Sequence, residues 1–225
     1  MSWKTNTIVV RPALLGADPD EFLGRLGYEK RRKSKEVLLA ESGGASIWIG
    51  AISDRIIVYT PLAGHFFDGC VDGPVDQDFS FLRSALFRHF PEADIAAFFL
   101  DSRVGAWGFA VFRRGALIRR FYGHDGTIIG DEGSQLPAEN AYLANCDRVE
   151  VDGEILYRSR SDLGDEPLSL ADHGEGLFCE VWRSFTGYGF DAPELLQIPG
   201  SDFWLNDDED EFLARRRRPW WKFWG

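Results

Sequence analysis

Alternating apolar and polar positions predict most of the β-strands in this chain. Trp107, Phe109 and Val111 share one face of a predicted strand, as a half-buried strand requires. Arg113-Arg114-Gly115 follows directly and predicts a hairpin turn. Other segments of this kind bring the predicted strands to 6–10, 37–40, 46–52, 55–60, 94–101, 107–112, 116–122 and a weaker one at 154–157.

Three segments instead repeat apolar residues at helical spacing between capping residues. The first starts at Asp18, with Pro19 in the first helical position and Glu21 as capping partner, and ends at Gly27. The second is predicted over residues 79–90, capped by Asp78 and stopped by Pro91. The third starts at Asp172, with Glu175 as capping partner, and ends at Gly187. Their apolar faces consist of Phe22, Leu23 and Leu26; of Leu82, Ala85, Leu86 and Phe90; and of Phe178, Val181, Trp182 and Phe185.

The order of these elements predicts an α+β fold. Strands arrive in consecutive groups that suit antiparallel pairing, and three helices separate the groups. Residues 61–78 and 123–171 are rich in Gly, Asp and Pro and are interpreted as loops. We therefore expect one domain over residues 1–200, a mainly antiparallel sheet with three helices, followed by a tail over residues 201–225.

The middle of the chain resembles an uncharacterised bacterial family of unknown function. Members of that family carry a similar Trp-x-Phe-Ala-Val hairpin, a Gly-x-Ile turn, a Leu-Pro pair and a closing helix that ends in Phe-x-Gly. The resemblance covers roughly residues 94–190, and the spacing departs from the family pattern after Gly126. It implies paired strands, a turn and a helix, and it implies no reaction or ligand. The residues that carry it are Trp107, Phe109, Ala110, Val111, Gly115, Leu117, Arg119, Gly126, Ile128, Gly133, Leu136, Pro137, Glu139, Gly174, Glu175, Phe185 and Gly187.

The charge is acidic and unevenly distributed. Five of the 25 Lys and Arg residues lie in the last eleven positions, so the first 214 residues hold 20 basic against 36 acidic residues, a net charge of −16. Such a body repels phosphate backbones, so we expect no nucleic-acid partner. A basic patch at Lys30–Lys35 is interpreted as a solvated turn.

Compartment and membrane contact follow from the apolar runs and the cysteines. The longest strongly apolar run, residues 95–100, is too short to span a membrane, and the run at residues 8–10 stops at Arg11, so no signal peptide is expected. Three cysteines without a CxxC pair favour a reducing cytoplasm.

Motifs for catalysis or cofactor binding are weak. The loop from Asp68 to Asp78 resembles a calcium loop, but Cys70 and Phe79 occupy positions where an EF-hand needs oxygen ligands. Asp68, Asp72 and Asp76 could still hold a cation. The four histidines form no HxxxH or HExxH pair, Gly174-Glu175-Gly176 lacks the third glycine of a dinucleotide loop, and no nucleophile elbow is present.

Two further sets of residues could carry acid–base or thiol chemistry. His124 and Asp125 are adjacent and could serve acid–base chemistry, although a glycine-rich turn is the favoured interpretation. Cys70 with His65 could form a nucleophilic pair, and Cys179 is interpreted as a small buried apolar residue. We expect no metal, no cofactor and no catalytic residue.

The C-terminal tail has the composition of a contact segment. Tryptophan and arginine dominate the energetics of protein interfaces, so a partner protein or a second copy is one expected target. A membrane surface and the chain's own domain are the alternatives. The expected partner-binding residues are Arg215, Arg216, Arg217, Arg218, Trp220, Trp221, Phe223 and Trp224.

Together these features predict a non-catalytic acidic binding protein of the bacterial cytoplasm, in the manner of an immunity protein that antagonises a basic partner. Two alternatives remain open at this stage: an enzyme whose site lies around His124 and Asp125 or in the Asp68–Asp78 loop, and a peripheral membrane protein anchored by its Arg/Trp tail.

Overall fold

The computed structural model describes residues 4–13, 18–28, 32–42, 47–67, 77–160 and 166–204. Within them eleven strands accompany five α-helices and two short 3₁₀ helices. The strands are β1 (Lys4–Arg11), β2 (Arg32–Leu38), β3 (Ile47–Ile52), β4 (Arg55–Tyr59), β5 (Asp94–Asp101), β6 (Ala106–Arg113), β7 (Ala116–His124), β8 (Thr127–Gly133), β9 (Cys146–Val151), β10 (Glu154–Ser159) and β11 (Pro199–Trp204). The helices are α1 (Pro19–Arg25), α2 (Gln77–His89), α3 (Pro137–Leu143), α4 (Gly174–Thr186) and α5 (Pro193–Leu196), with η1 (Leu39–Glu41) and η2 (Pro61–Phe66).

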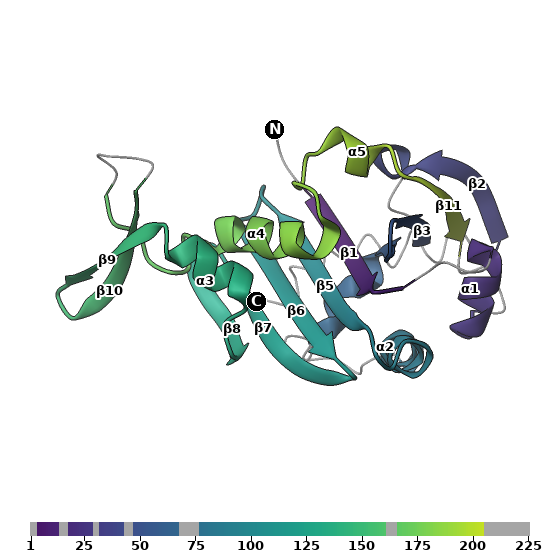
Figure 1. The fold of residues 1–225 in the computed structure, drawn as a ribbon, viewed down its shortest axis with the longest axis horizontal. Helices are drawn as coiled ribbons and strands as arrows, with labels where there is room; N and C mark the ends of the chain where they lie inside the picture. Colours follow the sequence, from purple (N-terminus) through teal and green to yellow (C-terminus); the bar gives the residue numbers. More distant parts are fainter. Residues whose placement is uncertain are drawn as a thin grey trace.

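Nine of the strands form one antiparallel sheet. Their order is β2-β11-β3-β4-β1-β5-β6-β7-β8, and β9 and β10 form a separate two-stranded sheet. The run from β5 to β8 is a meander of consecutive hairpins, while the last strand, β11, lies between β2 and β3. The second sheet projects from the body beyond α3 (Figure 1). We call β9 and β10, residues 146–159, the arm.

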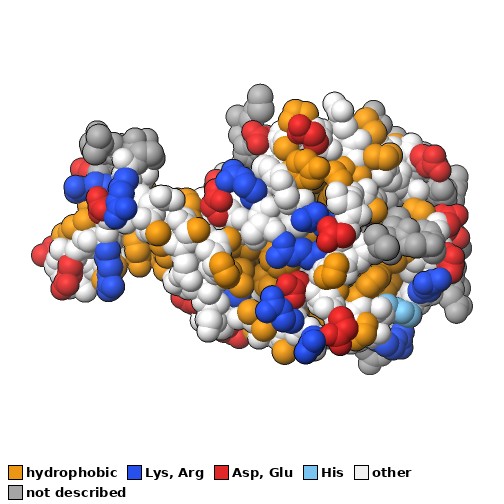
Figure 2. Space-filling model, in the orientation of Figure 1, with side chains coloured by type: hydrophobic (Ala, Val, Ile, Leu, Met, Phe, Trp, Pro, Cys, Tyr) orange, Lys and Arg blue, Asp and Glu red, His pale blue; other side chains and the backbone are white. Residues whose placement is uncertain are grey.

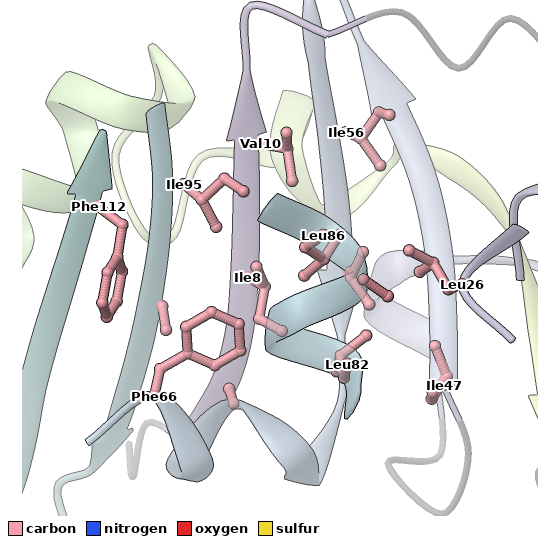
Figure 3. Close-up of a cluster of buried hydrophobic side chains, with 14 of the residues drawn as sticks. Ile8, Val10, Leu26, Ile47, Ile56, Phe66, Leu82, Leu86, Ile95 and Phe112 are labelled. Atoms are coloured by element: carbon pink, nitrogen blue, oxygen red, sulfur yellow. The ribbon is translucent and has the colours of Figure 1, made fainter. Parts of the chain in front are cut away.

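Helices cover both faces of the large sheet, because neighbouring residues of each strand point to opposite faces. In β1, Ile8 and Val10 belong to one buried cluster and Val9 to the other. The first cluster lies against α1, α2 and η2, where Leu26, Leu82 and Phe66 pack onto the strands (Figure 3).

The second cluster lies against α4 and α5. Phe178, Val181, Trp182 and Phe185 of α4 are buried on it, and Phe98 of β5 makes edge-to-face ring contacts with three of them. Burial of an aromatic or branched side chain contributes about 1.5–3 kcal/mol, so this stripe accounts for the docking of α4. Arginines of the sheet contact the end of the helix, where Arg55 Nε donates to the carbonyl of Phe185 at 2.7 Å.

The structure confirms the α+β class and the antiparallel sheet, and it corrects the number of helices. Five helices are present in the described residues instead of three, four of them with seven residues or more. The segment 123–171 is not one loop, because it contains β8, α3, β9 and β10. β11 crosses the position near residue 200 where the tail was expected to start, so the sheet extends at least to Trp204.

The predicted helix caps are confirmed in part. Asp18 accepts a hydrogen bond from the Asp20 amide and Gly27 ends the turn with φ 89°, but Glu21 pairs with Arg25 instead of capping. Asp172 does not cap α4: its carboxylate binds the amide and hydroxyl of Ser169, and the helix begins at Gly174 with His173 as its N-cap residue.

Candidate functional site

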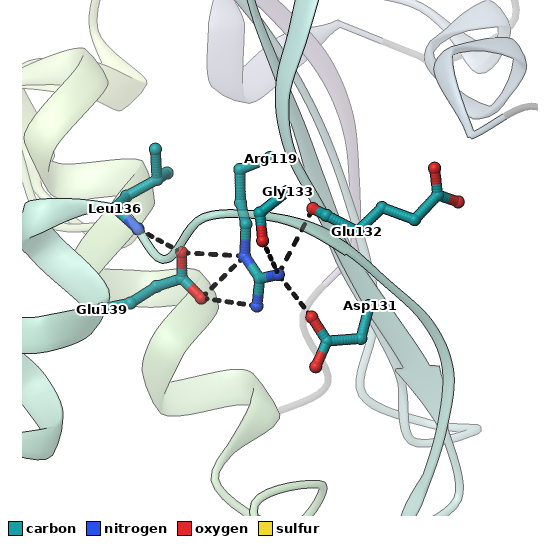
Figure 4. A network of polar contacts seen from close by, with 6 residues as sticks. All are labelled: Arg119, Asp131, Glu132, Gly133, Leu136 and Glu139. Carbon is teal, nitrogen blue, oxygen red and sulfur yellow. Dashed lines mark hydrogen bonds and ion pairs between the residues drawn. The ribbon is translucent and has the colours of Figure 1, made fainter.

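An ion pair with both partners buried, an arginine and a glutamate, lies beneath α3. The Arg119 and Glu139 side chains are each 2 % exposed. Arg119 Nε donates to both carboxylate oxygens of Glu139 at 3.1 Å, and Nη2 lies 3.0 Å from Oε1 (Figure 4). Burial by itself would lower the pKa of Arg119, but hydrogen bonds to Glu139 and Asp131 raise it above its usual value. Arg119 therefore keeps its positive charge although it is buried.

The remaining donors and acceptors of this pair are satisfied by neighbouring protein groups. Arg119 Nη1 contacts the Asp131 carboxylate and the carbonyls of Glu132 and Gly133, the latter two at 3.3 Å. Glu139 Oε2 also accepts the Leu136 amide at 2.7 Å, which caps the first turn of α3. The network joins β7, β8 and α3, and its saturated geometry indicates a structural role.

A histidine is also buried and hydrogen bonded to protein groups, at the place where α3, α4 and the arm meet. His173 is 6 % exposed; its Nε2 lies 3.1 Å from the Tyr157 carbonyl and its Nδ1 lies 3.0 Å from the Tyr142 hydroxyl. A carbonyl only accepts, so Nε2 donates to Tyr157, and in the neutral ring Nδ1 then accepts from the Tyr142 hydroxyl. Both ring nitrogens are engaged, and the side chain fixes the root of the arm to the body.

The two cysteines in the described residues are poor nucleophiles. Burial raises the pKa of the Cys146 thiol, and burial together with Glu175 and Glu180 raises the pKa of Cys179. Both thiols stay protonated at neutral pH, and the reactive form of cysteine is the thiolate. Cys70 lies outside the described residues.

The structure places His124 and Asp125 in a tight turn between β7 and β8. Asp125 and Gly126 are its two central residues with φ of 48° and 70°, a combination typical of hairpin turns. The Asp125 amide donates to the Gly105 carbonyl at 3.1 Å. Among the described residues, no hydrogen bond or ion pair joins the His124 side chain to a carboxylate, so the favoured turn interpretation explains why these residue types stand here.

Two glycines that resembled a phosphate loop serve close packing instead. A Cβ on Gly174 would lie 1.9 Å from Trp107 Cε2, and one on Gly176 would lie 2.4 Å from the Tyr142 hydroxyl oxygen. Both distances are far below van der Waals contact. These glycines therefore let α4 approach β6 and α3. This close packing explains why glycine stands at both positions without a bound phosphate.

Several predicted residues lie outside the described residues. These are residues 68–76 of the Asp-rich loop, the side chains of the Lys30–Lys35 patch, and the tail residues Arg215–Arg218, Trp220, Trp221, Phe223 and Trp224. In the parts of the chain that are described, no group of three or more His, Cys, Asp or Glu side chains is arranged to hold a metal ion. None of the described helices is long and apolar enough to cross a membrane.

A hollow of about 580 Å³ lies far from these groups, at the start of α1. Asp18, Glu36 and Ser201 are among its described lining residues. Asp18 already caps α1, and no histidine or cysteine is among those lining residues.

The arm carries the feature that points most clearly to a binding surface. Large apolar side chains that are strongly exposed among the described residues are Val151 (43 %) and Ile155 (39 %) on the arm, Leu168 (46 %) beside it and Ile129 (42 %) on β8. Figure 2 shows acidic and basic side chains gathered on the arm together with apolar ones. Exposed apolar groups on a projecting element are typical of contact surfaces.

The tip of the arm, residues 150–155, is also acidic. Glu150, Asp152 and Glu154 are exposed, and none of them forms an ion pair with another described residue. Sequence reasoning missed β9, although Asp152-Gly153 between two alternating runs is a strong hairpin signal. Both turn residues have positive φ, 52° and 84°.

Comparison with known proteins gives a family match. The model of a family of unknown function (DUF6928) matches residues 70–189, which include the meander, the buried Arg119 network, α4 and the arm. No curated protein and no solved structure matches the chain.

Proposed function

The chain belongs to the family of unknown function DUF6928, and we propose that it works as a non-catalytic acidic binding protein that engages a basic protein partner through the tip of its arm. The family match confirms the resemblance predicted from the sequence. It assigns no activity, so the function is argued from the surface of the molecule.

One contrast carries the proposal. Three of the ionisable groups that the fold buries, Arg119, Glu139 and His173, are held by hydrogen bonds within the protein. At the arm tip, by contrast, Val151 and Ile155 are exposed beside carboxylates without ion-pair partners among the described residues. A buried, saturated set of polar groups suits a scaffold, and an exposed apolar and acidic tip suits recognition.

Charge selects the kind of partner. The whole chain carries −11, and the arm tip adds no basic residue to Glu150, Asp152 and Glu154. Complementary charge steers association and rejects acidic competitors. A basic protein with an apolar groove fits this tip, and antagonism of a basic toxin, as by an immunity protein, is the most concrete form of the proposal.

A pull-down with the full chain tests the proposal. The immobilised protein is incubated with a lysate of its source organism at low salt and washed with rising salt. A basic protein should be retained and then released as salt screens the contact. Retention of no partner at low salt would contradict the proposal.

Paired variants assign the contact to the tip. Asp152→Asn with Glu154→Gln removes two charges from the tip. Asparagine tolerates the positive φ of position 152, so the turn should be kept. Glu21→Gln with Glu92→Gln removes the same charge from other exposed regions. Only the first pair should weaken retention; equal effects would show that net charge alone, and not the tip, binds the partner.

Antagonism needs a separate readout. A captured basic protein that is toxic when expressed alone should lose its toxicity when it is co-expressed with the wild-type chain, and regain it with the tip variant. Unchanged toxicity with the wild-type chain would leave binding in place and eliminate the immunity role.

A further inference from the structure

The arm has one open edge that a second protein chain can extend. β9 and β10 pair with each other, and Tyr157 of β10 forms a bridge with Leu168 on its other side. Among the described strands, none pairs with the outer edge of β9. A two-stranded sheet is marginal by itself, and three or more strands are needed for independent stability.

The backbone groups that face this edge can be identified from the hydrogen bonds of Tyr157. Its amide donates to the Leu168 carbonyl at 2.8 Å, and its carbonyl accepts the Leu168 amide at 2.9 Å, so both groups point away from β9. Arg148 is directly opposite Tyr157 in the β9–β10 ladder. In an antiparallel ladder such a pair directs all its backbone groups outward. Arg148, and with it Glu150 two residues on, therefore present their amides and carbonyls to the open edge.

The side chains of the same two residues have opposite charge. Arg148 and Glu150 are both exposed, and neither forms an ion pair with another described residue. They share one face of β9, while Val149 between them lies on the other face, opposite Leu156 of β10. Arg148, Val149 and Glu150 therefore give the edge strand a basic, an apolar and an acidic residue in succession.

We propose that the open edge of β9 pairs antiparallel with β9 of a second copy of this chain, about a two-fold axis at Val149. Arg148 of each copy then lies opposite Glu150 of the other, with their outward backbone groups exchanging hydrogen bonds. The two Val149 residues meet on the opposite face. The result is a four-stranded sheet whose central row is Leu156, Val149, Val149 and Leu156.

This register is selected over its neighbours by charge. Only every second residue of β9 directs its amide and carbonyl to the open edge. The self-pairing can therefore shift only in steps that keep two such residues opposite each other. The neighbouring registers place Arg148 opposite Arg148, or Glu150 opposite Glu150, and like charges directly opposite each other are destabilising. The second of them also brings Arg148 toward Asp152, but Asp152 lies in the turn beyond β9 with φ 52° and does not continue the strand. An interface that is its own complement is what two-fold symmetry requires.

The dimer is compatible with the proposed binding function and extends beyond it. Glu150 is used between the copies, while Asp152 and Glu154 lie outside the central pairs and stay exposed for a basic partner. The paired assembly presents two such tips.

Sedimentation equilibrium of the full chain over a range of concentrations tests the proposal. The wild-type chain should show a reversible monomer–dimer equilibrium. Arg148→Glu and Glu150→Arg each place like charges opposite one another twice, so either should raise the dimer dissociation constant about tenfold or more. The double variant restores opposite charges and should recover the wild-type constant.

A matched control is Arg158→Gln, which removes a positive charge from β10 of the same arm, away from the open edge, without placing a like charge opposite Asp147. It should leave the equilibrium unchanged. A monomer at every concentration would overturn the proposal, and so would a dimer that ignores the single reversals or that the double variant fails to restore. Circular dichroism of each variant excludes misfolding as the cause.

A cross-link fixes the register independently. With diamide as oxidant, Val149→Cys should form a disulfide between copies, because residues facing each other in a non-hydrogen-bonded antiparallel pair have Cα atoms about 4.5 Å apart. The wild-type chain is the background control, and absence of the additional covalent dimer would contradict the axis. Retention of a basic partner by a chain that stays monomeric would overturn the dimer alone and leave the proposed function standing.

Discussion

Two arginine–carboxylate sets in the family-matched region differ in burial and in their bonding partners. Arg119 and Glu139 are each 2 % exposed and fully hydrogen bonded between β7 and α3. Arg148 and Glu150 stand exposed on the arm without ion-pair partners among the described residues. The first set holds the fold together, and the second is available to another chain. Charged residues therefore have different roles in two parts of one family domain. Where they are buried they stabilise the fold, and where they are exposed they are available for contacts with another chain.

The largest expected effect comes from breaking the buried pair. Glu139→Ala leaves the buried Arg119 with only the half-exposed Asp131 as a charged partner and removes the cap on the Leu136 amide, so the free energy of unfolding should fall by about 3–5 kcal/mol. Urea denaturation at pH 7 measures it. Glu132→Ala is the control, because Glu132 pairs with Arg120, the next residue of β7, but its side chain is 50 % exposed. That change should cost at most about 1 kcal/mol, and equal losses would refute the assigned roles.

A glycine at the helix–sheet contact gives the next effect. Gly174→Ala places a Cβ 1.9 Å from Trp107, and overpacking of this kind costs about 1–3 kcal/mol. Gly64→Ala is the control, since nothing lies within 4 Å of a Cβ there. The same urea titrations apply. A Gly174→Ala protein more stable than the wild type would show that Trp107 moves aside without cost.

Buried Asp101 predicts a dependence on acid. Hydrogen bonds from Arg103 lower the pKa of Asp101 despite its burial, and Lys4 lies 3.6 Å away. A carboxylate with a depressed folded-state pKa contributes stability above its unfolded pKa of about 4 and loses it as pH falls through the folded value. Urea unfolding between pH 6 and pH 2 should show this loss. Asp101→Asn should flatten the acid limb; an unchanged limb would assign it to other carboxylates such as Asp94.

The sequence predicted the parts of the fold whose pattern is local. Strands and helices with a strong period, such as β5 and α4, were found within a few residues, because burial on one or both faces imposes that period. The segment 123–171 was misread since β8, β9 and β10 bury little on either face, and alternation fades without a core to impose it. α5 and β11 depend on contacts with η1, β2 and β3, which are far away in the chain.

The candidate site was less predictable than the fold. Arg119 and Glu139 were recognised only as part of a family pattern, and their pairing across 20 residues depends on α3, which was not predicted. The acidic tip was visible as residues but not as a surface, because exposure on a projecting arm is a property of the assembled molecule. The proposed docking role therefore rests on the structure, while the expected acidic character came from composition.

The smallest expected effect on stability concerns the arm and separates its role from that of the core. Ile155 is 39 % exposed, so Ile155→Thr, which keeps a β-branched residue in β10, should change the free energy of unfolding by no more than about 0.5 kcal/mol. Ile56, which is fully buried, should lose stability measurably with the same substitution, because the new hydroxyl lies in an apolar cluster. Ile155→Thr should nevertheless weaken retention of the basic partner, since it removes apolar contact area at the tip. Full retention together with a large loss of stability would show that Ile155 serves the fold and that the tip is not a docking element.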